Sequence, residues 1–274
     1  MKQQSNINNH YAKKSLGQNF IVNRNFLLKL DKSLRIDEND VLIEIGPGKG
    51  ALTEFLVKKK FKKLYLIEKD KLLFKDLEQK YKSSDKITVC NDDALLYDFK
   101  YFNLINNNVV ILGNLPFNIS TKLLTLWLKD DKWPSFFNRM ILMFQKEVAD
   151  RILAKHNTKD YGRISILANF RLEVTDNFKI SKNCFFPKPA VDSKIIVFKP
   201  KTNINYNIRN IKNLEKITNI FFSNKRKMIN KPLSKTFKEY KDVAKKLKLN
   251  LSSRPSELSC NDYYRITEFY EKFN

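Results

Sequence analysis

The chain has 274 residues, enough for one large domain or for a large and a small one. Its apolar content of 42% supports a folded core and excludes global disorder. The net charge of +23 predicts a polyanionic partner, nucleic acid before a membrane, although a Lys- and Asn-rich composition typical of AT-rich genomes can supply part of it.

The cysteines and histidines exclude several kinds of chemistry. Cys90, Cys184 and Cys260 are widely separated and fit neither a disulfide framework nor a zinc site, so we expect reduced thiols in a cytoplasmic protein. The only histidines are His10 and His156, which argues against Ser-His or Cys-His catalysis and most histidine-ligated metals. We therefore expect no metal.

The N-terminal region is polar. Residues 1–14 are predicted to form a flexible polar tail. Residues 1–10 are polar and Asn-rich and lack the apolar segment of a secretory signal. No apolar run is long enough to cross a membrane. The segment LGQNF at 16–20 is either a lead-in loop or a segment that lies across a ligand, and a helix is predicted over 25–34.

The first predicted strand, residues 41–45, runs directly into a glycine turn. Gly46, Gly48 and Gly50 are three of only six glycines in the chain, and a helix is predicted over 51–59. A strand, a glycine turn and a helix N-terminus together let the backbone approach a ligand closely.

Acidic residues end the next two predicted strands. Glu68 ends the predicted strand 64–68 and lies 22 positions after Gly46, where an acid is placed to bind ribose hydroxyls. Asp93 follows the strand 87–90, where a carboxylate could meet the adenine amine of the same ligand. Each acid alone would be an ordinary solvated strand end, but together they indicate a site.

The fourth predicted strand, residues 109–112, leads into the segment GNLPFNIS at 113–120 and then a helix over 121–127. Asn114 offers an uncharged hydrogen-bond acceptor, and Phe117 offers a ring on which a base can stack. An ordinary strand-to-helix turn is the alternative, since Asn and Pro both favour turns.

The remaining pattern predicts strands at 140–144, 172–178 and 194–199 and helices at 146–154 and 164–170. Alternating strands and helices predict an α/β fold with a doubly wound parallel sheet and ligands at the carboxyl ends of its strands. In the loop 184–193, the rings of the Phe pair either cap the core or stack on a base.

The chain becomes more basic after Pro200. Residues 199–274 hold 18 basic and 7 acidic residues, which predicts a basic helical domain over 201–274 after a main domain over 15–200. Residues 221–229 are predicted to form an amphipathic helix whose basic face carries Lys225, Arg226 and Lys227. Residues 252–259 predict a turn and a new helix start.

Gly46-x-Gly48-x-x-Ala51 also fits the fingerprint of dinucleotide-binding dehydrogenases. Two features argue against hydride chemistry: the chain offers no evident His or Tyr acid–base residue, and a small metabolite needs no basic helical domain.

The assembled motifs closely resemble the ribosomal RNA adenine N6-dimethyltransferases, which use S-adenosylmethionine. The matching segments, in family order, are LGQNF at 16–20, EIGPGKG at 44–50, NLPFNIS at 114–120, QKEVA at 145–149 with Arg151, YGR at 161–163, and FFPKPAVDS at 185–193. Matches around 224–233 and 249–264 resemble the small-subunit branch. That branch usually has Tyr where this chain has Phe117, a residue that also occurs in the large-subunit resistance branch.

The resemblance implies a Rossmann-like class I methyltransferase domain with a small all-helical C-terminal domain. It implies dimethylation of two adjacent adenosines in the 3′-terminal hairpin of small-subunit RNA, with the immature small subunit as partner and a role in its biogenesis. The alternatives are the large-subunit resistance branch and a non-catalytic nucleic-acid binder. We expect a monomer without membrane association.

The resemblance also assigns residues. The residues that would border S-adenosylmethionine are Asn19, Ile21, Gly46, Gly48, Glu68, Asp93 and Asn114. Catalysis would involve Asn114, Leu115, Pro116 and Phe117, and the rings of Phe117 and Phe185 would stack on the base. RNA would be bound by Lys225, Arg226 and Lys227. We hypothesise that the Asn114 side-chain oxygen and the Leu115 carbonyl accept the two N6 hydrogens of an unstacked adenosine, so that its lone pair points at the methyl group.

Overall fold

The computed structural model describes every residue except 1–11, 14–17, 24, 100–107, 116–118 and 274. The strands are β1 (Phe20–Ile21), β2 (Asp40–Ile45), β3 (Lys63–Glu68), β4 (Ile87–Asn91), β5 (Asn108–Gly113), β6 (Arg139–Gln145), β7 (Leu172–Ile180), β8 (Phe185–Phe186) and β9 (Ser193–Pro200). The helices are α1 (Asn25–Leu34), α2 (Thr53–Leu56), α3 (Lys71–Tyr81), α4 (Ser120–Leu128), α5 (Lys146–Leu153), α6 (Arg163–Arg171), a 3₁₀ turn η3 (Lys182–Cys184), α7 (Ile211–Phe222), α8 (Asn230–Thr236), α9 (Tyr240–Lys246) and α10 (Cys260–Phe273).

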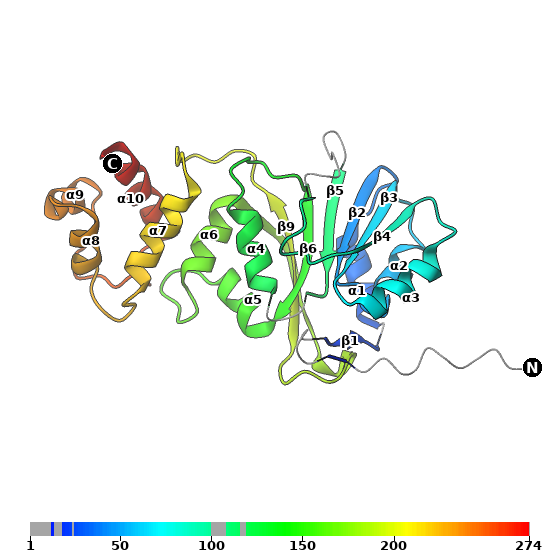
Figure 1. Ribbon diagram of the computed structural model, residues 1–274. Coiled ribbons are helices and arrows are strands. Elements are labelled where there is room, and N and C mark those ends of the chain that lie inside the picture. Colours follow the sequence, from blue (N-terminus) through cyan, green and yellow to red (C-terminus); the bar gives the residue numbers. More distant parts are fainter. Residues whose placement is uncertain (1–11, 14–17, 24, 100–107, 116–118, 274) are drawn as a thin grey trace, which may run out of the picture. The chain divides into compact units, whose positions relative to one another are not determined.

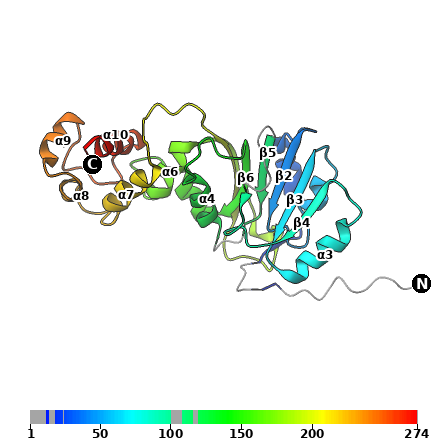
Figure 2. The same ribbon diagram turned by 45° about the horizontal axis from the view of Figure 1, so that its top comes forward.

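The central sheet has seven strands in the order β4-β3-β2-β5-β6-β9-β7, and β1 pairs with β8 in a separate two-stranded sheet. The four neighbouring pairs from β4 to β6 are parallel, as the alternation of strands and helices predicts. Figures 1 and 2 show β2, β3 and β4 side by side, and Figure 1 shows α1, α2 and α3 nearby. The predicted α/β, Rossmann-like fold is confirmed.

The described residues group into two compact units. One consists of Met1–Lys122, Arg139–Lys146 and Asp176–Val197, and the other of Leu123–Asn138, Glu147–Thr175 and Phe198–Asn274. Each unit is built from three segments that are not consecutive in the chain. The domain boundary expected at residue 200 therefore stays a prediction.

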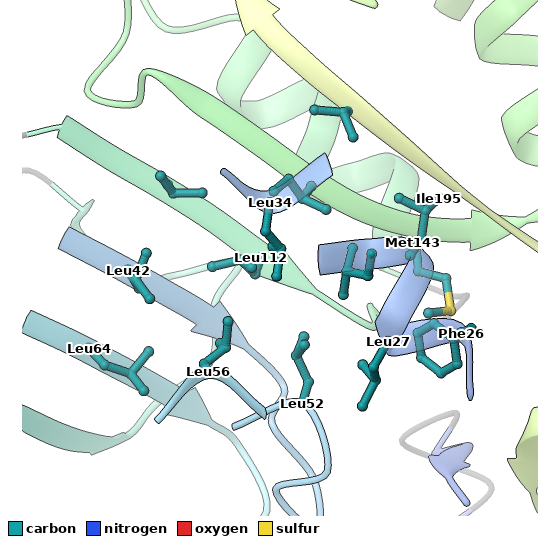
Figure 3. Packing of buried hydrophobic residues seen from close by; sticks show 14 of the residues in the cluster. Phe26, Leu27, Leu34, Leu42, Leu52, Leu56, Leu64, Leu112, Met143 and Ile195 are labelled. Carbon is teal, nitrogen blue, oxygen red and sulfur yellow. The ribbon is translucent and has the colours of Figure 1, made fainter. Parts of the chain in front are cut away.

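The core of the first unit lies where apolar helix faces meet the sheet. β2 is buried along its whole length, which explains its nearly continuous apolar sequence. On α1, Phe26, Leu27, Leu30 and Leu34 recur at helical spacing and form the buried face. Figure 3 shows Leu34 of α1 next to Leu112 of β5, and both belong to the same core cluster as Leu27.

Leu112→Ala should lower the free energy of unfolding by about 2–5 kcal/mol, because the side chain is fully buried and its loss leaves a cavity. Urea denaturation measures the change. Leu96→Ala is the matched control: Leu96 is 82% exposed and its truncation should change stability by less than about 0.5 kcal/mol. Equal effects of the two variants would contradict this description of the core.

In the second unit, aromatic residues join α10 to α7 and α6. The rings of Phe221 and Tyr263 lie 5.6 Å apart, and the Tyr264 hydroxyl donates to the carbonyl of Ile166 at 3.1 Å. α10 begins after Ser259, whose hydroxyl accepts from the backbone N–H of Asp262, in agreement with the helix start expected there. Among the described residues, no helix is long and apolar enough to span a membrane.

Two predicted helices differ from the structure. The helix expected over 221–229 is wrong: α7 ends at Phe222, and residues 223–227 form turns before α8. Asn224 accepts through its carbonyl from the N–H of Lys227, which closes such a turn and interrupts the helix. The helix expected over 51–59 is limited to α2, because the chain leaves the glycine turn through further turns.

Candidate active site

The predicted site residues of the sheet meet because of strand register. Ile45 of β2 lies opposite Ile67 of β3 on one side and Gly113 of β5 on the other. The residues that follow them, Gly46, Glu68 and Asn114, therefore emerge at one edge of the sheet. All three line a pocket of about 150 Å³, together with Asn19, Phe20, Ile21, Glu44, Gly48, Asp93 and Leu115.

The glycine turn forms one wall of this pocket. Gly46, Gly48 and Gly50 have φ values of 63°, 60° and 78°, in the left-handed region that favours glycine. A Cβ added to Gly48 would also lie 3.1 Å from the ring of Phe20. Residue 48 is therefore restricted to glycine both by its backbone and by the ring packed against it.

Glu68 ends β3 with its carboxylate in the same pocket and only 6% of its surface exposed. One oxygen accepts from the N–H of Gly48 at 3.1 Å, and the other accepts from the N–H of Asp70 at 2.8 Å. Burial raises the pKa of Glu68, while these backbone hydrogen bonds oppose the rise. The carboxylate is thus held in one orientation, and each oxygen retains acceptor capacity for a ligand hydroxyl.

Asp93 lies in the loop after β4 and already has a cationic partner. Lys69 contacts its carboxylate at 2.7 Å, and the N–H of Leu95 donates to it at 3.0 Å. Burial raises the pKa of Asp93, but these contacts outweigh burial and hold the pKa below its ordinary value. Asp93 is therefore an ionised acceptor at the pocket wall.

The side chain of Asn114 has a defined orientation at the end of β5. Its Nδ2 donates to the backbone carbonyl of Asn19 at 2.9 Å. The amide oxygen makes no hydrogen bond within the part of the chain that the structure describes. Leu115 follows with 1% of its surface exposed and also lines the pocket. The site therefore offers a neutral amide oxygen as an acceptor beside an apolar wall.

Glu44 is a pocket residue that the sequence analysis assigned no role. It belongs to β2, is 2% exposed, and accepts a hydrogen bond from the hydroxyl of Thr53 at 2.7 Å. Burial raises the pKa of Glu44 from 4.5 to about 8, although the hydrogen bond from Thr53 opposes this rise. A single acid within an apolar run is the sequence signal for such a group.

The raised pKa of Glu44 predicts a pH-dependent stability. Between pH 4.5 and about 8 the unfolded chain has released this proton while the folded chain keeps it, so the free energy of unfolding should fall as the pH rises. The slope from this group is at most about 1.4 kcal/mol per pH unit. Glu44→Gln should lack this contribution, so its stability relative to the wild type should rise from pH 5 to pH 8 in urea denaturation. A pH-independent difference between the two proteins would contradict the prediction.

A second feature that sequence analysis missed holds the N-terminal residues against α3. Asp70, the N-cap of α3, contacts the ammonium group of Lys13 at 2.9 Å and accepts from Nε2 of Gln18 at 3.2 Å. Gln18 in turn lines the pocket, and the N–H of Asp70 donates to Glu68.

Two of the predicted base-stacking and RNA-binding residues are placed differently from expectation. The ring of Phe185 is 4% exposed and packs in the core, so the alternative that it caps the core describes its position. Lys225 is half-buried, and its Nζ donates to the carbonyls of Lys159 and Tyr161 at 2.6 and 2.8 Å. Arg226 and Lys227 are exposed. Leu16, Gly17, Pro116 and Phe117 lie outside the described residues.

The described residues contain no group of three or more His, Cys, Asp or Glu side chains able to hold a metal ion. The pocket instead combines an apolar floor with the acceptors Glu68, Asp93 and Asn114. Such a site can bind a molecule with hydroxyl and amine donors and can orient an amino group beside it.

Comparisons with known proteins agree with this geometry. Residues 9–272 match the family model for ribosomal RNA adenine dimethylase. The chain is 42% identical to the ribosomal RNA small subunit methyltransferase A of Pelagibacter ubique, covering 95% of this chain and 97% of that protein. It is 38% identical to the protein of the same name from Malacoplasma penetrans, covering 96% and 94%.

Solved structures give the same result for the fold. A dimethyladenosine transferase from Plasmodium falciparum superposes with a TM-score of 0.76 at 26% identity, covering 92% of this chain and 97% of the other. The 23S rRNA methyltransferase ErmE superposes with a TM-score of 0.68 at 20% identity, covering 92% and 100%. The second likeness, at this lower identity, concerns the fold alone.

Proposed function

The chain belongs to the ribosomal RNA adenine dimethylase family, and from that premise we propose that it acts on the small ribosomal subunit. The reaction is the transfer of methyl groups from S-adenosylmethionine to N6 of two adjacent adenosines in the 3′-terminal hairpin of small-subunit RNA. The relatives from Pelagibacter ubique and Malacoplasma penetrans, which carry small-subunit names over nearly their full lengths, support this branch over the large-subunit branch.

The observation that carries the proposal is the orientation of Asn114. Its Nδ2 is occupied by the carbonyl of Asn19, so the oxygen is the atom left to accept a hydrogen bond from a substrate. An acceptor is what an exocyclic amine requires, because that amine presents N–H donors. Hydrogen bonds from N6 to Asn114 and to the Leu115 carbonyl would favour a pyramidal nitrogen with its lone pair free to attack.

The residues of the pocket fit S-adenosylmethionine. The missing side chain at Gly48 leaves room beside the ring of Phe20, Glu68 offers acceptors for ribose hydroxyls, and Asp93 offers one for the adenine amine. Asn19, Ile21 and Gly46 complete the walls. The cofactor supplies a methyl group already activated by its positively charged sulfur.

The chain's own contribution is therefore positioning. Asn114 and Leu115 hold the amine in line with the methyl group, and the apolar wall keeps water away from it. The target adenosine must leave its stack to enter the pocket. Phe117 is the ring we assign to stacking on that base, and we assign Pro116 to the same catalytic segment.

The basic residues after Pro200 bind the RNA in this proposal. Arg226 and Lys227 are exposed and offer two adjacent cations for phosphate groups. Lys225 has a different role, because it anchors the turn that carries them to the carbonyls of Lys159 and Tyr161. The 201–274 domain would thus dock on the immature small subunit, and we propose a cytoplasmic monomer.

One experiment tests the proposed function. Small and large subunits from cells lacking the enzyme are incubated separately with the protein and labelled S-adenosylmethionine, and modified nucleotides are mapped by mass spectrometry. We expect dimethyladenosine at two adjacent positions near the 3′ end of the small-subunit RNA. Label in large-subunit RNA would favour the other branch. The absence of label, together with no rise in melting temperature on adding the cofactor, would indicate a non-catalytic binder.

A further inference from the structure

The small sheet of β1 and β8 sorts two neighbouring Phe residues to opposite faces. Phe20 pairs with Phe186, and Ile21 pairs with Phe185, in antiparallel register. Directly paired residues project to the same face of a sheet, and successive residues project to opposite faces. Phe185 and Ile21 therefore share one face, and Phe186 and Phe20 share the other.

The two faces have different surroundings. Phe185 and Ile21 pack against the hydrophobic core of the first unit, and Ile21 also lines the pocket. Phe20 lines the cofactor pocket, where the ammonium group of Lys49 lies 5.1 Å from the centre of its ring. Phe186 lies beside Phe20 on the same face of the small sheet, with Cβ atoms about 5 Å apart as expected for paired residues, and is not among the residues that line the pocket.

Phe186 is exposed where its neighbour is buried. Its ring is 68% accessible, against 4% for Phe185 and 8% for Phe20. It makes no aromatic or cation–π contact with another described residue. Val22 and Val191 are also exposed, at 60% and 42%, and Lys188 is exposed two residues away. The two segments that carry this ring and its pairing strand thus also expose apolar side chains and a cation.

The position of this ring relates it to the acceptor amide. Asn114 bonds to the carbonyl of Asn19, Asn19 precedes Phe20, and Phe20 pairs with Phe186. The Asn19 carbonyl, which accepts the hydrogen bond from Asn114, is therefore separated from Phe186 by only one peptide unit and one strand spacing. With a net charge of +23 on the chain, the occupant favoured for an exposed ring at this place is a nucleobase.

We propose that Phe186 stacks on the nucleobase next to the adenosine being methylated and so helps to hold the RNA at the pocket. This role rests on the proposed function, and it adds a stacking residue to those that the sequence predicts. A flanking base stacked outside the pocket would stabilise the strand after the target base has left its own stack.

Steady-state kinetics with unmethylated small subunits test the proposal. Phe186→Ala should raise KM for the subunit by about five- to tenfold or more, because stacking on an aromatic ring contributes about 1–3 kcal/mol per base. The Kd for S-adenosylmethionine should stay at the wild-type value. Phe186→Leu should show the same loss and Phe186→Tyr should restore KM, since a flat ring and not apolar bulk is required. Leu28→Ala, at an apolar side chain 70% exposed on α1, is the control and should leave KM unchanged.

A photo-crosslinking amino acid at position 186 locates the contact directly. We expect crosslinks to nucleotides adjoining the two methylated adenosines. Crosslinks to a ribosomal protein or to distant RNA would overturn the proposal, as would a wild-type KM for Phe186→Ala. Failure of the proposed function is distinct, because the wild-type protein itself would then transfer no methyl group to the small subunit.

Discussion

Asn114→Ala should reduce the rate of methyl transfer at saturating substrates by about 100-fold or more, while the Kd for small subunits changes little. In the proposed mechanism the side chain orients the reacting amine, and loss of correct geometry at a reacting atom can cost about 100-fold in rate. Single-turnover assays with labelled S-adenosylmethionine measure the rate, and sedimentation with subunits measures binding. The expected signature is a loss of rate without a loss of complex.

Asn114→Asp tests separately whether the orientation of the side chain is required. It keeps the size of the side chain but places an oxygen where Nδ2 donates to the Asn19 carbonyl, so the orientation should be lost with the rate. Gln79→Ala, on the exposed surface of α3, is the neutral control. If Asn114→Ala kept more than a tenth of the wild-type rate, the amide would not be the group that positions the amine.

Glu68→Ala should weaken the binding of S-adenosylmethionine by about 10- to 100-fold or more. The variant removes the carboxylate that is oriented by the N–H groups of Gly48 and Asp70, and hydrogen bonds to a charged group are each worth about 1.5–3 kcal/mol. Isothermal titration calorimetry measures the Kd, and the rise in melting temperature caused by the cofactor should shrink with it.

Glu78→Gln serves as the control for Glu68→Ala, because Glu78 is an exposed acid on α3 in the same unit. Its Kd should match that of the wild type. An unchanged Kd for Glu68→Ala would show that the ribose is bound elsewhere, and Glu68 would then be only a support for the glycine turn.

The sheet and its pocket were predictable because their signals are local. Apolar runs ending in Gly46, Glu68 and Asn114 mark strand ends, and parallel pairing brings such ends together. The α1 helix was predicted with the bounds that the structure gives, because its apolar residues follow the helical repeat.

The features that sequence reasoning missed depend on contacts between distant residues. In a two-residue strand the face of each side chain is set by its partner, so nothing local distinguishes Phe185 from Phe186. The carbonyls that bind Lys225 belong to residues more than 60 positions earlier. The prediction of a helix over 221–229 assumed that its basic face is exposed to solvent. For Lys225, the two carbonyls take the place of water around the ammonium group.

The anchoring of Lys225 changes what the formal charge of the chain means for RNA affinity. In the proposed complex with RNA, an ammonium group bound to two carbonyls of its own chain displaces no cation from the RNA backbone, whereas the exposed Arg226 and Lys227 can do so. Counterion release is the source of the salt dependence of such binding, and it scales with the number of phosphates neutralised. The ionic-strength response of the complex is therefore set by fewer cations than a count of lysines and arginines suggests.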